Sequence, residues 1–313
     1  MLIFALIACK ATRRSDDGTP DSSATDTGVE SATDSGATDD SAPPAGDPVS
    51  LRFYGTGKGN QDRVRIPLDP GGGSPAVDVG ADNFMVEFFV NGLVGDNSAV
   101  EQDCSEADWR RGNVVVDSTW HDGTGQTPGY GVSLAGGQVL FHVNILGKTE
   151  TICGQRDVLD GSWHHVAVGR RAKDGQLWLL SDGLIEVVTY GPDGDLSYPD
   201  GQAAGTECGQ GADQECVNDP YLVLGAEAHD TGPPFPSFNG TIDEVRISST
   251  LRYDSPYEVP TRAFQVDGET VGLFHLDEAS GEVAENAAGG ENGELLIGGN
   301  PEGPEWVTES PFE

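Results

Sequence analysis

The clearest candidate for catalytic chemistry in this 313-residue sequence is a group of three closely spaced carboxylates. They lie in the run Glu101-Gln-Asp103-Cys-Ser-Glu106. Two glutamates that project from one strand into a cleft can cleave a glycosidic bond as nucleophile and acid/base. Such a strand needs apolar residues between the carboxylates. Here Gln, Cys and Ser intervene, and the flanks GDNSAV and ADWRRG are typical of a loop, so we favour an acidic loop.

Five cysteines are present, and one of them lies inside this acidic run. Cys9 belongs to a different kind of sequence, so the remaining four count out evenly. We predict the disulfides Cys104–Cys153 and Cys208–Cys216, which the loop-entropy model credits with about 4 and about 2.5 kcal/mol of stabilisation. Zinc binding is the alternative, but no CxxC pair or suitable histidine spacing supports it.

The N-terminus, MLIFALIAC, is apolar and ends in a cysteine that follows a small residue. Its last four residues resemble the bacterial lipobox, in which the cysteine is diacylated and becomes N-terminal after cleavage. No Lys or Arg precedes the short apolar run, which departs from the usual signal peptide, and a chance cysteine is the alternative. We expect residues 1–9 to be a lipoprotein-type signal peptide. Cys9 would then anchor an exported chain at the bacterial outer membrane or cell surface.

Residues 10–48 are rich in Asp, Ser, Thr, Ala and Gly. Such a segment cannot bury enough apolar surface to offset its ordering entropy, so we expect a disordered acidic linker. It holds nine acidic and three basic residues, a net charge of −6, which leaves −29 of the total −35 on residues 49–313. A surface this negative repels nucleic acid and anionic lipid headgroups. It favours divalent cations or a salty habitat, and solubility alone is the alternative.

Residues 49–313 carry the folded part of the chain, in which apolar and polar residues alternate. Period-two alternation over residues 84–90 and 139–145 predicts strands that bury one face. About a dozen such runs occur, several of them separated by turn sequences such as AGG, KDG and SDG. No alternation of strands with helices is visible, so the sheets should be antiparallel. The sequence thus predicts an all-β, two-sheet antiparallel sandwich.

The order of these strand sequences resembles a known family. The order is LRFYG, VRIP, FMVEFFV, GYGVSLAGGQVLFHV, DGSWHHVAV, DGQLWLLSDGLIEVV, YLVLGAE and FNGTIDEVRISSTLRY. It resembles the laminin G-like or concanavalin A-like domains of bacterial surface proteins, over nearly everything after the linker. The resemblance implies a jelly-roll sandwich of two curved sheets but no single function, since this fold hosts lectins, protein-binding domains, hydrolases and lyases. The carboxylates Glu101, Asp103 and Glu106 also fit the spacing of laminarinase-like glycoside hydrolases with this fold.

One carboxylate falls on the predicted core face of a strand. In GTIDEVRIS, period two places Asp243 on the same face as the apolar residues that follow it. A buried carboxylate needs a cation, an arginine or several backbone N–H groups. Related sandwiches hold a structural calcium at an equivalent aspartate together with carbonyls from the first strand, which implies a Ca²⁺ site at Asp243, the Gly55 carbonyl and Asp62. The alternative partners are backbone N–H groups or an arginine such as Arg52 or Arg65.

Long loops between the strands offer aromatic and polar side chains to a ligand. The candidates are Trp109, Trp120, His121, Tyr130 and His229. Aromatic faces stack against sugar rings, while carboxylates and amides bind hydroxyl groups, so these side chains suit a carbohydrate. The alternative is that the aromatic residues only cover the ends of the sandwich.

The sequence therefore predicts a surface-anchored, non-catalytic binding module for a carbohydrate or an extracellular protein. A glycan-active enzyme that uses Glu101, Asp103 and Glu106 is one alternative, and a purely structural envelope lipoprotein is the other. We expect a monomer that binds a structural Ca²⁺ and no nucleic acid.

Overall fold

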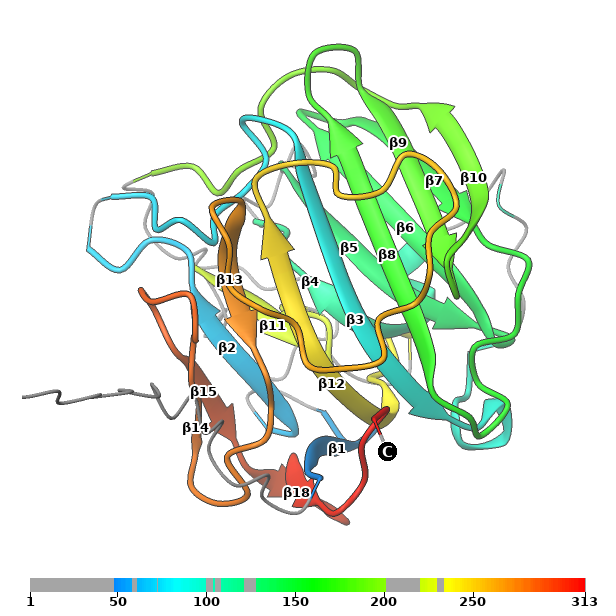
Figure 1. The fold of residues 1–313 in the computed structure, drawn as a ribbon, viewed down its shortest axis with the longest axis vertical. Helices are drawn as coiled ribbons and strands as arrows, with labels where there is room; N and C mark the ends of the chain where they lie inside the picture. Colours follow the sequence, from blue (N-terminus) through cyan, green and yellow to red (C-terminus); the bar gives the residue numbers. More distant parts are fainter. Residues whose placement is uncertain are drawn as a thin grey trace, which may run out of the picture. The chain divides into compact units, whose positions relative to one another are not determined.

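Almost all regular structure in this protein is β-strand. The computed structural model describes residues 48–57, 61–71, 73–99, 104, 108–120, 128–200, 220–229 and 234–312. Within them, helix is limited to two short 3-10 segments, η1 (Val94–Asp96) and η2 (Trp109–Arg111). The strands form two antiparallel eight-stranded sheets and one two-stranded ladder (Figure 1). The predicted all-β, two-sheet antiparallel fold is confirmed.

The first sheet, sheet A, has the strand order β10-β9-β8-β3-β12-β1-β18, and β13 also pairs with β12. Its strands are β1 (Ser50–Tyr54), β3 (Phe84–Gly92), β8 (His164–Arg171), β9 (Gln176–Ser181), β10 (Leu184–Tyr190), β12 (Asn239–Ser248), β13 (Thr270–Phe274) and β18 (Glu305–Val307). The strand β1 lies between β12 and β18, so the beginning and the end of the described chain meet in one sheet.

The second sheet, sheet B, has the strand order β14-β15-β2-β11-β4-β5-β6-β7. Its strands are β2 (Arg63–Pro67), β4 (Asn113–Asp117), β5 (Gly129–Ala135), β6 (Gln138–Ile145), β7 (Lys148–Cys153), β11 (Tyr221–Leu224), β14 (Val283–Ala284) and β15 (Gly293–Leu296). The two-stranded ladder joins β16 (Gly298–Gly299) to β17 (Glu302–Gly303).

The core lies between the two sheets and follows the predicted alternation. Phe88 and Val90 of β3 and Phe141 and Val143 of β6 are all 0% exposed and belong to one hydrophobic cluster. Burying each such side chain contributes roughly 1.5–3 kcal/mol, so this cluster is the main source of stability. The residues between them in sequence point to the outer face of their own sheet.

The position of Asp243 differs from the prediction because β12 contains a β-bulge. Its pairing with β3 changes register between Asp243 and Arg246, and Glu244 has a positive φ of 52°. Ile242 and Val245 both reach the core, while Asp243 lies opposite Phe89 on the outer face of sheet A. The extra residue of a bulge shifts the period-two pattern by one position, so the predicted core-facing orientation of Asp243 is wrong.

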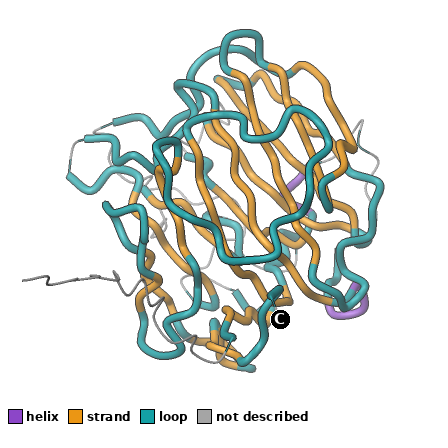
Figure 2. The backbone as a smooth tube through the Cα atoms, viewed as in Figure 1, coloured by secondary structure: helices purple, strands orange, loops and turns teal. Residues whose placement is uncertain are grey.

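Residues 249–269, which we call the strap, cross the outer face of sheet A (Figures 1 and 2). Leu251, Tyr253 and Tyr257 of the strap pack against a cluster that includes Trp178 of β9. The strap has no regular secondary structure, so these side chains fix it to the sheet.

The predicted disulfide between Cys104 and Cys153 is confirmed, with a Cα–Cα distance of 5.9 Å. It ties the segment before η2 to the end of β7. Cys208 and Cys216 lie outside the described residues, as does Cys9, and their predicted roles stay predictions. The predicted boundaries of segments 1–9, 10–48 and 49–313 also stay predictions. In the described part of the chain, no helix has the length and apolar character needed to cross a bilayer.

Candidate functional site

A row of side chains crosses the outer face of sheet B. The ladder pairs Val223 of β11 with Asp117 of β4, Asp117 with Gly131 of β5, Gly131 with His142 of β6, and His142 with Thr151 of β7. Directly paired residues of antiparallel strands project to the same face. This face points away from the core, because the neighbours of His142 along β6 are core residues. Gly131 leaves the centre of the row without a side chain.

Trp109 fills the space above Gly131. Its indole stacks on the imidazole of His142, with ring centroids 5.7 Å apart and an interplanar angle of 18°. Burial lowers the pKa of His142 to about 4, so the ring is neutral near pH 7. The hydroxyl of Ser133 on β5 and the backbone N–H of Gly112 both donate to the Trp109 carbonyl. The single turn η2 is thereby held flat against sheet B.

A cavity of about 440 Å³ opens beside Trp109, over the outer face of sheet B. Its walls come from η2, from β6 and β7, and from the segments that follow β4 and β11. The lining residues are Asp108, Trp109, Arg110, Thr119, Trp120, His142, Asn144, Thr149, Glu227 and His229. The cavity thus combines indole rings with amide, hydroxyl, imidazole and carboxylate groups, within the usual size range of small-molecule sites.

One wall of the cavity is fixed by charge. The guanidinium of Arg110 pairs with the carboxylate of Asp108 at 3.0 Å and lies over the ring of Phe235, 4.9 Å from its centroid. Trp120 forms part of the lining as well, and its ring meets Tyr198 edge-on at a centroid distance of 6.4 Å. These contacts hold the side chains of the wall in set positions.

Asp117, Glu227 and His229 form a buried cluster next to this cavity. Each offers one ligand atom, and these atoms lie within 4.8 Å of one another. The Asp117 carboxylate accepts hydrogen bonds from the Thr119 N–H at 2.8 Å and the Ala228 N–H at 2.8 Å. Burial, and then the charge of Glu227, raise the pKa of Asp117 to about 6, while the charge of His229 opposes the shift. Two carboxylates and one imidazole at this spacing can hold a divalent cation.

Arg63 supports the cluster from the neighbouring strand β2. It is fully buried and donates to the Glu227 carbonyl at 2.9 Å. Burial lowers the pKa of Arg63 to about 10, and the charges of Glu227, Asp62 and Asp117 oppose this shift. Its positive charge therefore offsets part of the repulsion between the buried carboxylates.

The sequence of this region matches a known domain family. Residues 116–250, which include most of sheet B, match the model of the laminin G domain. The match covers less than half of the chain, so it shows a laminin G-like segment at residues 116–250. The resemblance seen in the strand order is thus confirmed. No curated protein matches the sequence significantly.

Solved structures similar to this chain have low sequence identity to it. A Bacteroides ovatus protein, to which carbohydrate binding has been ascribed, is 14% identical over 80% of this chain and 58% of its own, with a TM-score of 0.46. Domains LG4-5 of the mouse laminin alpha1 chain are 15% identical over 71% of this chain and 47% of their own, with a TM-score of 0.41. The SAP-like pentraxin from Limulus polyphemus is 12% identical over 66% of this chain and 78% of its own, with a TM-score of 0.41. The chain spans less than two thirds of the length of the first two.

The fold brings together three of the five predicted ligand-binding residues. Trp109, Trp120 and His229 all line the cavity. Tyr130 lies in the core instead, with its ring centroid 4.9 Å from that of Phe84, so it does not face the cavity. His121 lies outside the described residues.

The predicted calcium ligands are not brought together. Asp62 accepts from the backbone N–H groups of Tyr54 at 3.0 Å and Thr56 at 2.9 Å, and burial raises its pKa. Gly55 follows Tyr54, which pairs with the first residue of β12, whereas Asp243 lies four residues farther along that strand. Measured along the strands at about 3.3 Å per residue, Asp243 therefore lies roughly 16 Å from Gly55.

The buried carboxylate of Asp243 is hydrogen-bonded to the backbone of the next residue. Its carboxylate accepts from the Glu244 N–H at 3.0 Å. Burial, and then the charge of Glu244, raise the pKa of Asp243 to about 9. The side chain is therefore protonated at neutral pH in the absence of a cation.

The carboxylates Glu101, Asp103 and Glu106 lie outside the described residues. Cys104, which stands between them in sequence, is bonded to Cys153 at the end of β7.

Proposed function

We propose that this chain is a non-catalytic binding module that holds a carbohydrate in the cavity over sheet B. The observation that carries the proposal is the cavity itself, in which indole rings stand beside polar groups and a buried cluster of metal-ligating side chains. Trp120 offers an aromatic surface for a sugar ring, while Asn144 and Thr149 offer hydrogen bonds to hydroxyl groups. Fixed polar groups in a concave site suit a ligand rich in hydroxyls better than a flat protein surface.

The proposed site includes a divalent cation held by Asp117, Glu227 and His229. A cation there would offset the charges of two buried carboxylates and could bind ligand hydroxyls at its open coordination positions. The oxygen ligands suit Ca²⁺ or Mn²⁺, and the imidazole also suits Zn²⁺. This proposed cation site differs from the structural Ca²⁺ site predicted at Asp243, Gly55 and Asp62.

Substitution of Trp120 tests the carbohydrate site. A glycan array, probed without a cation and with Ca²⁺, Mn²⁺ or Zn²⁺, first identifies a bound oligosaccharide, and calorimetry then measures its affinity. We expect Trp120→Ala to weaken binding roughly tenfold or more, because an aromatic contact contributes about 0.5–1.5 kcal/mol beyond its buried area.

The matched control is Trp306→Ala. Trp306 lines a separate groove, and its indole N–H donates to the Gly281 carbonyl at 3.0 Å. The Trp306→Ala variant should leave the affinity for the oligosaccharide unchanged. If no glycan binds with any of the three cations, or if both variants weaken binding equally, the carbohydrate site is wrong and a protein partner becomes the better hypothesis.

We also propose that Cys9 is lipidated and anchors the module at the bacterial cell surface, with residues 10–48 as the linker. The lipobox-like sequence before Cys9 supports this. In a bacterial host fed a labelled fatty acid, the wild-type chain should become labelled and Cys9→Ala should not. Equal labelling of both proteins, or of neither, would remove the anchor from the proposal.

A further inference from the structure

Gly131 occupies a position where a side chain would collide with the floor of the cavity. A Cβ atom built on this glycine would lie within 2.5 Å of three atoms of the six-membered ring of Trp109. Real Cβ atoms do not approach other atoms this closely, so any larger residue at position 131 must displace the indole. Because Gly131 lies between Asp117 and His142 in the sheet, the displacement would occur in the middle of the site.

The described neighbours of Trp109 block several directions in which a displaced indole could move. Its other neighbours include Val114, Ala135 and Leu140, which form a buried cluster with it. The backbone is held through the bond from Ser133 to the Trp109 carbonyl, and one ring face lies against His142. Trp109 is 2% exposed and lines the cavity. An indole pushed off sheet B therefore rises into the cavity.

We propose that Gly131 is a specificity-determining residue, because its missing side chain sets the depth of the cavity and so the size of the carbohydrate that fits. The inference rests on the proposed function for the identity of the ligand, but the packing of Trp109 against Gly131 does not depend on that function. Trp109 then acts as a positioning residue: it forms the floor and carries Asp108 and Arg110 on the adjoining turn.

The test compares Gly131→Ala with a control glycine. In the described part of the chain, no atom lies within 4 Å of a Cβ built on Gly95, so Gly95→Ala adds the same methyl group without a collision there. The probes are the strongest oligosaccharide from the array and the monosaccharide at its end. We expect Gly131→Ala to weaken binding of the oligosaccharide about tenfold and of the monosaccharide less than about threefold, because the displaced indole occupies space that only the longer ligand fills. Gly95→Ala should change neither affinity.

A second substitution separates a displaced indole from general damage. Phenylalanine lacks the outer ring atoms that the new Cβ would meet, so Trp109→Phe should relieve the collision. In a double-mutant cycle, Gly131→Ala should then cost less than about threefold in the Trp109→Phe background. Equal losses in both backgrounds, or equal losses for both probes, would overturn the proposal.

A measurement without any ligand distinguishes this inference from the proposed function. The indole N–H resonance of Trp109, assigned through Trp109→Phe, should shift in Gly131→Ala and not in Gly95→Ala. If the resonance shifts but no glycan binds the wild-type protein, the carbohydrate proposal fails, while the packing of Trp109 against Gly131 is supported. If it does not shift, the inference fails whatever the wild-type protein binds.

Discussion

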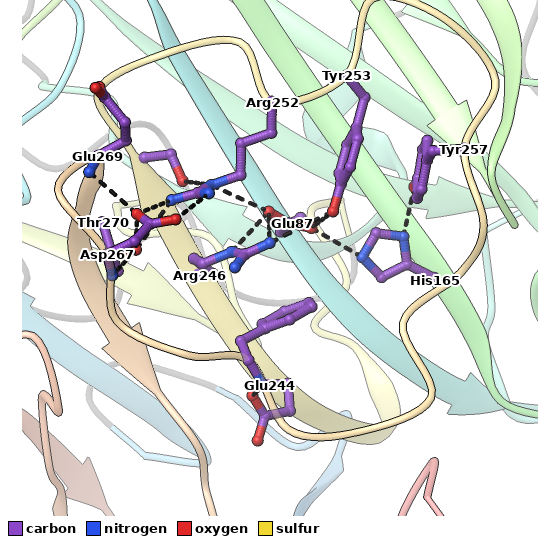
Figure 3. Close-up of polar contacts among 12 residues, drawn as sticks. Glu87, His165, Glu244, Arg246, Arg252, Tyr253, Tyr257, Asp267, Glu269 and Thr270 are labelled. Atoms are coloured by element: carbon purple, nitrogen blue, oxygen red, sulfur yellow. Dashed lines mark hydrogen bonds and ion pairs between the residues drawn. The ribbon is translucent and has the colours of Figure 1, made fainter.

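Replacement of Glu87 by alanine should lower the free energy of unfolding by about 3–5 kcal/mol, the cost of leaving buried charges without their partner. Glu87 is 0% exposed and lies on the outer face of sheet A, beneath the strap. Its carboxylate accepts hydrogen bonds from Arg246 at 2.8 Å, His165 at 3.1 Å and the Tyr253 hydroxyl at 3.0 Å (Figure 3).

The network around Glu87 also fixes the strap. The Tyr257 hydroxyl lies 2.6 Å from the second ring nitrogen of His165, and Tyr257 stacks on Tyr253 with centroids 3.6 Å apart. Arg252 and Asp267, near the two ends of the strap, form paired hydrogen bonds of 2.8 and 2.7 Å. Removal of the carboxylate should therefore loosen residues 249–269 as well as destabilise the sheet.

The same network gives Glu87 a defined pH dependence. Burial alone would raise its pKa, but the hydrogen bond and charge of His165 and the charge of Arg246 hold the pKa below its ordinary value of 4.5. Because the folded pKa lies below the unfolded one, this stabilisation is present above about pH 4.5 and is lost as the pH falls through the folded value.

Chemical unfolding and proteolysis measure both effects. Glu87→Ala should show the loss of stability at pH 7 and faster tryptic cleavage after Arg252 and Arg262 of the strap. The control is Asp174→Ala, which removes the partner of an exposed arginine, Arg171, and should leave the free energy of unfolding nearly unchanged, because solvent screens an exposed ion pair. Similar losses for the two variants would show that the buried network contributes nothing special.

Substitution of Asp117 by asparagine should abolish stabilisation of the protein by divalent cations. A cation at 100 times its Kd stabilises the folded state by about 2.7 kcal/mol if it does not bind the unfolded chain. Loss of a hydrogen-bonded partner behind a metal ligand already weakens metal binding about 10–100-fold, so loss of a ligand itself should cost at least that much. The melting temperature of the wild-type protein should therefore rise with Ca²⁺, Mn²⁺ or Zn²⁺, and that of Asp117→Asn should not.

The control for the cation site is Asp243→Asn. Since the pKa of Asp243 is raised to about 9, asparagine resembles the protonated acid that is present at neutral pH. This variant should keep the full response to the cation. If instead Asp243→Asn removes the response and Asp117→Asn retains it, the cation binds at the position predicted from the sequence.

The local part of the architecture could be predicted from the sequence. Alternation of apolar residues located the core face of β3 and β6, and an even count of cysteines after Cys9 paired Cys104 with Cys153. Both features depend on short-range patterns or on simple counting. The orientation of Asp243 could not be predicted in this way, because a bulge inserts one residue without a distinctive sequence signal.

The site itself was predicted only in part. Trp109, Trp120 and His229 were selected as aromatic or polar loop residues, and the fold places them around one cavity. Asp117 and Glu227 were missed because they are far apart in sequence and are joined only by the pairing of β4 with β11. A carboxylate at the end of the apolar strand NVVVD, and a second two residues before the histidine in GAEAHD, are the signals that could have marked them.

The most direct test of the account is to follow the indole N–H resonances of the five tryptophans while the oligosaccharide from the array is added in the presence of the cation. Each resonance is assigned by a single Trp→Phe substitution. The account predicts that the signals of Trp120 and Trp109 shift and saturate together, while that of Trp306 stays in place. Saturable shifts at Trp306 with none at Trp120 would show that the carbohydrate binds elsewhere and would contradict the assignment of the cavity over sheet B.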